Sequence, residues 1–103
     1  MIETLVRFNI NEGVEKFRNE KNAVLLDVRR IDEYQEKHIP GSINIPVETI
    51  EQALDVLLDK NQTIYVYCRS GVRSLKAADA LIKMGYTNII EIGGILNYKG
   101  VTE

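Results

Sequence analysis

Residues that bind metals or form disulfides are scarce in this chain. It has one cysteine, one histidine and no tryptophan among 103 residues. One cysteine cannot form an internal disulfide, and one cysteine with one histidine supplies too few ligands for a zinc site of the usual Cys/His type. We therefore expect neither a disulfide framework nor a metal site.

Long apolar runs are lacking as well. No run approaches the ~20 residues that a transmembrane helix needs, so we expect no membrane partner. Residues 1–7 contain neither a long apolar stretch nor a small-residue cleavage site. Together with the single cysteine, this favours a cytoplasmic protein.

No charge of one sign dominates the composition. Charged residues make up 27% of the chain and hydrophobic residues 45%, and the formal net charge is -2. Length and composition indicate one compact domain over residues 1–103, large enough to bury a core. A chain without a basic surplus has no general attraction for nucleic acid, so we expect no nucleic-acid partner.

Strand-like and helix-like segments alternate along the chain. This alternation is typical of an α/β domain with a mainly parallel sheet. We expect strands at residues 5–8, 23–28, 43–45, 63–67 and 88–92. We expect helices after a capping box at Asn9–Glu12, over 31–37, over 48–58, and from the segment after Cys68, near Ser74, to Met84.

Apolar residues at helical spacing predict which helix faces are buried. In the segment 48–58 these residues are Ile50, Ala53, Leu54 and Leu57, and in the last helix they are Leu75, Ala78, Leu81 and Ile82. Gly93-Gly94 is expected to let the chain turn tightly after the last strand. The segment that then packs at the end of the chain contains Ile95, Leu96 and Tyr98.

The only cysteine, Cys68, lies where a β-rich run breaks into a short loop and then a helical pattern. A thiol in this place faces backbone N–H groups and the positive end of a helix dipole, and both favour the thiolate. A lone buried cysteine is usually an inert small hydrophobe. Here, however, Arg69 and Arg73 add positive charge to the loop, so we expect it to bind a small anion. We also expect the pKa of the thiol to fall from ~8.5 into the roughly 3.5–7.5 range of activated cysteines.

Three ordered motifs resemble those of the rhodanese family. The first comprises Leu25-Leu26-Asp27-Val28-Arg29, Asp32-Glu33-Tyr34 and His38-Ile39-Pro40-Gly41-Ser42-Ile43-Asn44-Ile45-Pro46, the second is Cys68-Arg69-Ser70-Gly71-Val72-Arg73-Ser74, and the third is Gly93-Gly94-Ile95. The resemblance runs from about Val24 to Gly100. It departs from the family at Tyr98, where tryptophan is common, and at Ser42, where alanine is common. It implies a rhodanese-like α/β fold, with a small central sheet flanked by helices on both faces.

The resemblance also implies a thiosulfate sulfurtransferase. In such an enzyme Cys68 would take a sulfane sulfur from a small anionic donor such as thiosulfate, hold it as a persulfide, and pass it to cyanide, a thiol or a partner protein. No cofactor is implied. The N–H groups of Arg69, Ser70, Gly71, Val72, Arg73 and Ser74 would hold the outer sulfur. Because the chain has no second cysteine, the persulfide would wait for an external acceptor.

The charged residues near the loop are interpreted from their own positions in the sequence. Asp27 and Arg29 are interpreted as supports for the loop, and His38 as a structural residue beside a Pro-Gly turn. For Arg73 two roles stay open, since it could bind the donor with Arg69 or hold the loop by pairing with Asp27.

Two alternatives to this enzyme are a phosphatase or arsenate reductase, and a regulatory or carrier domain. A phosphatase loop of the Cys-x5-Arg type needs arginine at position 74, which is serine here, whereas Arg73 closes a loop one residue shorter. This spacing disfavours phosphatase chemistry. The intact cysteine does not separate a free-standing enzyme from a persulfide carrier, and the sequence predicts neither the physiological donor and acceptor nor the oligomeric state.

Overall fold

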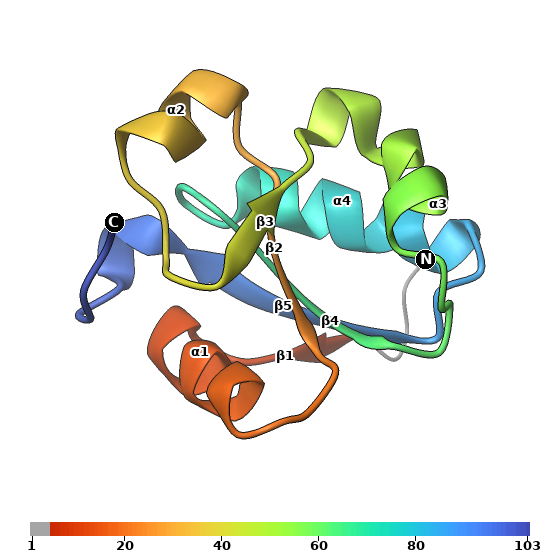
Figure 1. Ribbon diagram of the computed structural model, residues 1–103, viewed down its shortest axis with the longest axis horizontal. Coiled ribbons are helices and arrows are strands. Elements are labelled where there is room, and N and C mark those ends of the chain that lie inside the picture. Colours follow the sequence, from red (N-terminus) through yellow and green to blue (C-terminus); the bar gives the residue numbers. More distant parts are fainter. Residues whose placement is uncertain (1–4) are drawn as a thin grey trace.

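The fold is known from a computed structural model that describes residues 5–103 (Figure 1). Residues 1–4, the beginning of the expected domain, lie outside the described part. The strands are β1 (Val6–Arg7), β2 (Val24–Asp27), β3 (Ser42–Asn44), β4 (Thr63–Cys68) and β5 (Asn88–Gly94). The helices are α1 (Ile10–Arg18), α2 (Ile31–Glu36), α3 (Ala53–Val56) and α4 (Val72–Lys83), with 3-10 segments η1 (Val47–Gln52) and η2 (Ile95–Asn97).

Within residues 5–103 the strands form one five-stranded sheet in the order β1-β5-β4-β2-β3. Every neighbouring pair is parallel, which confirms the expected α/β class. Parallel strands place their carboxyl ends at one edge of the sheet, where sites of such folds form. β4 lies in the middle and continues to Cys68, one residue beyond the expected strand, so the cysteine ends the central strand at that edge.

Helices cover both faces of the sheet (Figure 1), as the family resemblance implied. On one face, α1 packs Ile10 and Val14 against Tyr65 and Ile92. On the other face, α4 and α3 cover a larger cluster that includes Val66 and Cys68. Asn9 caps α1 as expected, with its side chain accepting a hydrogen bond from the Glu12 N–H at 3.0 Å.

The expected helix over 48–58 is wrong in detail. The segment is a 3-10 turn followed by one short α-helical turn, and Thr49 has a non-helical backbone. Leu54, expected in the core, is 42% exposed. At the end of this short helix the Ala53 carbonyl accepts a hydrogen bond from the Leu57 N–H at 2.7 Å, and the Tyr86 hydroxyl lies within hydrogen-bond distance of the Ala53 and Leu57 carbonyls, at 2.9 and 2.7 Å.

The buried face of α4 also differs from the expected one. Its buried residues are Ser74, Ala77, Ala78 and Leu81, whereas Leu75 and Ile82 are about one-third exposed. The buried stripe is therefore made mostly of small residues, which let the helix approach β4 and β5 closely. In the terminal segment, Ile95 is buried as expected but Leu96 is exposed. None of the helices within residues 5–103 combines the length and the apolar character that crossing a membrane requires.

Candidate active site

Cys68 lies beneath the loop that joins β4 to α4. The residue is 0% exposed, and the Gly71 N–H donates a hydrogen bond to its Sγ at 3.0 Å. Gly71 has φ +103 and forms the N-cap of α4, which begins at Val72, two residues before the expected start. The glycine is required because a left-handed backbone here turns the chain sharply from strand to helix. The thiol thus faces the N-terminal end of a 12-residue helix.

The end of β5 packs against this loop. Val66 pairs with Glu91 and Cys68 pairs with Gly94, so β5 has one more residue than β4 across this interval, which is a β-bulge. The expected tight turn at Gly93-Gly94 is therefore wrong: both glycines belong to the strand. The Leu96 N–H then donates to the Arg69 carbonyl at 3.1 Å, which fixes the first loop residue to η2.

Arg73 holds the other end of the loop. Its Nη1 and Nη2 donate to Oε1 and Oε2 of Glu33 at 2.7 and 3.0 Å, a bidentate pair that joins α4 to α2. The proposed pairing of Arg73 with Asp27 is wrong, because Asp27 is occupied elsewhere. The hydrogen bond from Arg73, opposed by burial, lowers the pKa of Glu33 from 4.5 to about 2.

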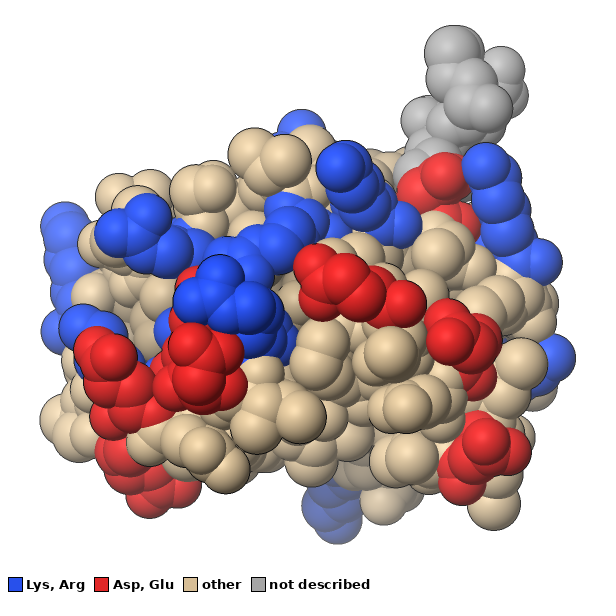
Figure 2. All heavy atoms as spheres, turned by 90° about the horizontal axis from the view of Figure 1, so that it is seen from above, with Lys and Arg blue, Asp and Glu red and all other residues tan. Residues whose placement is uncertain are grey.

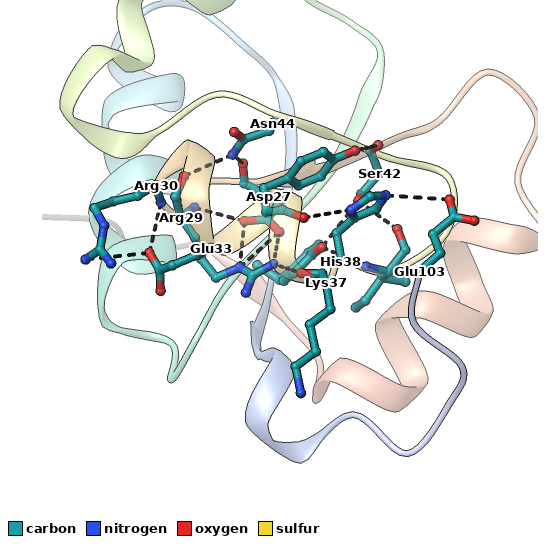
Figure 3. Close-up of polar contacts among 12 residues, drawn as sticks. Asp27, Arg29, Arg30, Glu33, Lys37, His38, Ser42, Asn44 and Glu103 are labelled. Carbon is teal, nitrogen blue, oxygen red and sulfur yellow. Dashed lines mark hydrogen bonds and ion pairs between the residues drawn. The ribbon is translucent and has the colours of Figure 1, made fainter.

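Asp27 and Arg29 form a buried ion pair with each other (Figure 3). The Nη2 of Arg29 donates to Oδ2 of Asp27 at 2.7 Å and to the Lys37 carbonyl at 2.7 Å. The pair ties the end of β2 to the connection after α2. His38, drawn in the same figure, donates from Nδ1 to the Tyr34 carbonyl at 2.8 Å. These contacts are those of structural residues.

Arg69, the residue directly after Cys68, is exposed. It lines a cavity of about 560 Å³ that also contains cationic side chains from Arg29, Arg30 and Lys37 and carboxylates from Glu33 and Glu36. Basic side chains gather on the upper face of the molecule near α2, with acidic side chains directly beside them (Figure 2). Neither sign of charge therefore dominates this face. Among residues 5–103, no group of three or more His, Cys, Asp or Glu side chains is placed to hold a metal ion.

Two contacts near the thiol were not predicted from the sequence. Cys68 Sγ lies 3.5 Å from Oγ of Ser74, and that hydroxyl donates to Oε2 of Glu91 at 2.5 Å. Glu91 is 1% exposed. The one sequence signal for it is a carboxylate inside an otherwise apolar strand, which calls for a buried partner.

The pairing of Glu33 with Arg73 predicts a pH dependence of stability. Because the pKa of Glu33 is lower in the folded protein than its ordinary 4.5, the pair stabilises the fold above pH 4.5 and is lost as the pH falls toward 2. Glu33→Gln should therefore cost about 1–3 kcal/mol at pH 7, and this cost should shrink steadily below pH 4.5. Urea unfolding of both proteins between pH 7 and 2.5 measures it. A cost that stays constant over this range would contradict the assignment.

Comparison with known proteins agrees with this geometry. Residues 11–100 match the Rhodanese-like domain. PspE, a thiosulfate sulfurtransferase of Escherichia coli, is 39% identical over 71 residues, which cover 68% of each chain. YrkF, a candidate sulfur carrier protein of Bacillus subtilis, is 37% identical over 90 residues, which cover 86% of this chain but only 48% of YrkF. The chain thus spans about half the length of that relative.

Solved structures show the same fold. A rhodanese with anions from E. coli superimposes with a TM-score of 0.72 and 34% identity, over 79% of this chain and 96% of that one. The family match covers most of the chain, including β4, the cysteine loop and the end of β5. The chain therefore belongs to the rhodanese-like domain family.

Proposed function

We propose that the protein transfers a sulfane sulfur from thiosulfate, or a related anionic donor, through a persulfide on Cys68. The observation that supports this most is the position of Sγ under a loop whose Gly71 N–H donates to it at 3.0 Å, at the start of α4. The first turn of a helix leaves its N–H groups without intrahelical acceptors. At Val72, Arg73 and Ser74 these groups are available to an anionic sulfur.

The reaction uses the chain's own residues. The Cys68 thiolate attacks the outer sulfur of thiosulfate, the S–S bond of the donor breaks, and sulfite leaves with the bonding electron pair. The product is a persulfide whose terminal sulfur carries the negative charge, which the loop N–H groups stabilise. A nucleophilic acceptor such as cyanide then attacks this terminal sulfur and releases the Cys68 thiolate.

The burial of Cys68 gives the persulfide a further use. At 0% exposure the thiol is out of reach of a bulky acceptor. A persulfide extends the reactive atom by one S–S bond, about 2 Å, away from the strand. An acceptor thiol or protein then needs to reach the outer sulfur and not Sγ itself.

Phosphatase chemistry is disfavoured by the partner of Arg73. A loop that cleaves phosphoesters needs an arginine free to bind the equatorial oxygens of the phosphoryl group, whereas Arg73 is held bidentately by Glu33. Two assays on one preparation test the proposal: thiocyanate formation from thiosulfate and cyanide, and hydrolysis of an aryl phosphate. We expect the first and not the second. Cys68-dependent phosphate release without thiocyanate would refute it.

A persulfide carrier is the second candidate. The carrier uses the same loading step but depends on a partner for release, and the lone cysteine favours it because no internal thiol competes for the sulfur. The similarity to YrkF points the same way. Stoichiometric loading by thiosulfate with slow turnover on cyanide, accelerated by a protein acceptor, would favour the carrier over the free-standing enzyme.

Arg69 is proposed to recruit the donor. Its side chain is exposed beside the loop and lines the charged cavity. Arg69→Ala should raise KM for thiosulfate roughly three- to tenfold with kcat little changed, since it removes attraction present before and during the reaction. Lys76→Ala removes an exposed cation from α4 and serves as the control. Initial rates over a range of thiosulfate concentrations measure both. An unchanged KM in Arg69→Ala would show that backbone N–H groups alone bind the donor.

A further inference from the structure

A buried carboxylate lies behind the nucleophile. Glu91 on β5 is 1% exposed, and its Oε2 accepts hydrogen bonds from the Ser74 hydroxyl at 2.5 Å and the Gly93 N–H at 2.9 Å. Its Oε1 accepts one from Nε of Arg7 on β1 at 3.0 Å. The sulfur transfer proposed above gives this glutamate no task.

Ser74 connects the carboxylate to the thiol. A hydroxyl has one proton, and Ser74 donates it to Oε2 of Glu91 at 2.5 Å. Oγ of Ser74 therefore presents a lone pair to Cys68, whose Sγ lies 3.5 Å away. This arrangement suits a protonated thiol that donates its S–H. A thiolate would face the lone pair, unless Ser74 turned its proton away from Glu91 and gave up that hydrogen bond.

The charges around the sulfur act in opposite directions. A carboxylate one hydroxyl away disfavours a second negative charge on Cys68. The Gly71 N–H and the start of α4 favour that charge. The positive charge of Arg73 also favours a negative charge on Cys68, although the hydrogen bonds of Arg73 go to Glu33. Arg7 balances Glu91 from the far side, but its side chain is 56% exposed, so solvent weakens its effect.

We propose that Glu91, acting through Ser74, is a positioning residue that favours the protonated thiol of Cys68 and so limits the reactive thiolate at neutral pH. The inference rests on the proposed function only in that Cys68 is the nucleophile. Thiolates are oxidised more readily than thiols, and this chain has no second cysteine to rescue an oxidised Cys68. Keeping the Cys68 thiol protonated therefore protects it from oxidation.

The pH profile of Cys68 alkylation tests the proposal without any sulfur donor. Iodoacetamide is added to the whole chain across a pH series, and intact mass follows the single cysteine. Glu91→Gln keeps an oxygen for Ser74 and Gly93 but removes the charge. We expect the midpoint of its profile to fall by about one pH unit, which makes alkylation about tenfold faster below the midpoint. Glu51→Gln, the same change on an exposed residue, should leave the profile unchanged. An unchanged or raised midpoint in Glu91→Gln would overturn the proposal.

A double-mutant comparison tests the part played by Ser74. If the hydroxyl transmits the effect, Glu91→Gln should shift the midpoint much less in a Ser74→Ala background than in the wild type. An equal shift in both backgrounds would exclude transmission through Ser74.

Arg7→Ala keeps the proposal testable if Glu91→Gln does not fold. Arg7 is exposed, and its loss leaves the Glu91 charge less balanced, so alkylation at pH 7 should become slower, by a smaller factor than the change expected in Glu91→Gln. Faster alkylation would contradict the proposal. Because alkylation needs no donor, a shifted profile in a protein that transfers no sulfur would refute the proposed function alone, and an unshifted profile in an active one would refute this inference alone.

Discussion

Replacing Cys68 by serine should abolish sulfur transfer from thiosulfate to cyanide while the domain stays folded. The serine hydroxyl is similar in size and can accept the Gly71 hydrogen bond that Sγ accepts. It cannot form a persulfide, so transfer should fall about 10³-fold or more, to the background level. Thiocyanate formation measures the activity.

The control for this variant is its stability. Cys68 is fully buried between β4 and α4, so a hydroxyl in its place should cost about 1–2 kcal/mol in urea unfolding. If the variant is folded, its loss of activity shows that the reaction needs the Cys68 thiol. Undiminished thiocyanate formation by Cys68→Ser would remove Cys68 from the mechanism.

Gly94→Ala should have the second largest effect, because the added methyl group collides with the active-site loop. A Cβ at this position would lie 2.2 Å from the carbonyl oxygen of Arg69 and 2.7 Å from Cα of Ser70, and both atoms are backbone. The loop must move to make room. We expect sulfur transfer to fall at least ~10²-fold, since a displacement of about 1 Å can cost this much, and stability to fall by about 1–3 kcal/mol.

Gly93→Ala is the matched control for this steric argument. Gly93 has φ +84, which costs an alanine about 1–2 kcal/mol, but its Cβ would meet nothing within 4 Å. Gly94 has an ordinary extended backbone, with φ -128, so its requirement for glycine is steric alone. Greater loss of sulfur transfer in Gly93→Ala than in Gly94→Ala would show that backbone conformation, and not the close approach, controls the loop.

The sequence predicted the part of the site that depends on order along the chain. The alternation of strands and helices indicated a parallel sheet, and a parallel sheet brings the ends of β2 and β4 to one edge. Asp27 and Cys68 therefore lie at that edge, as the position of each after an apolar run suggested. The loop residues Arg69–Ser74 follow Cys68 directly, and two of them, Gly71 and Ser74, contact its Sγ.

Partners brought together from distant segments could not be predicted in this way. The sequence contains several carboxylates that could pair with Arg73. Its actual partner, Glu33, is 40 residues away, and this pairing depends on how α2 lies against α4. Asp27 is taken by Arg29, two residues along the chain. A local pair of this kind is open to prediction when both residues are buried.

Glu91 shows a different limit of the sequence analysis. Its strand was predicted by the apolar residues around it, but the bulge at Gly93-Gly94, which aligns Gly94 with Cys68, leaves no clear mark in the sequence. The expectation that Cys68 is largely ionised at neutral pH considered the loop and the helix but not this carboxylate. The alkylation profile of Glu91→Gln measures how strongly this carboxylate opposes the ionisation of Cys68.

Intact-mass analysis after incubation with thiosulfate shows directly whether Cys68 carries the transferred sulfur. We expect a gain of one sulfur atom per chain, which cyanide removes and which Cys68→Ser does not show. Because the chain has a single cysteine, the added sulfur can be assigned without further mapping. A wild-type protein that forms thiocyanate while its mass never increases, or a mass gain that persists in Cys68→Ser, would show that the sulfur does not pass through Cys68.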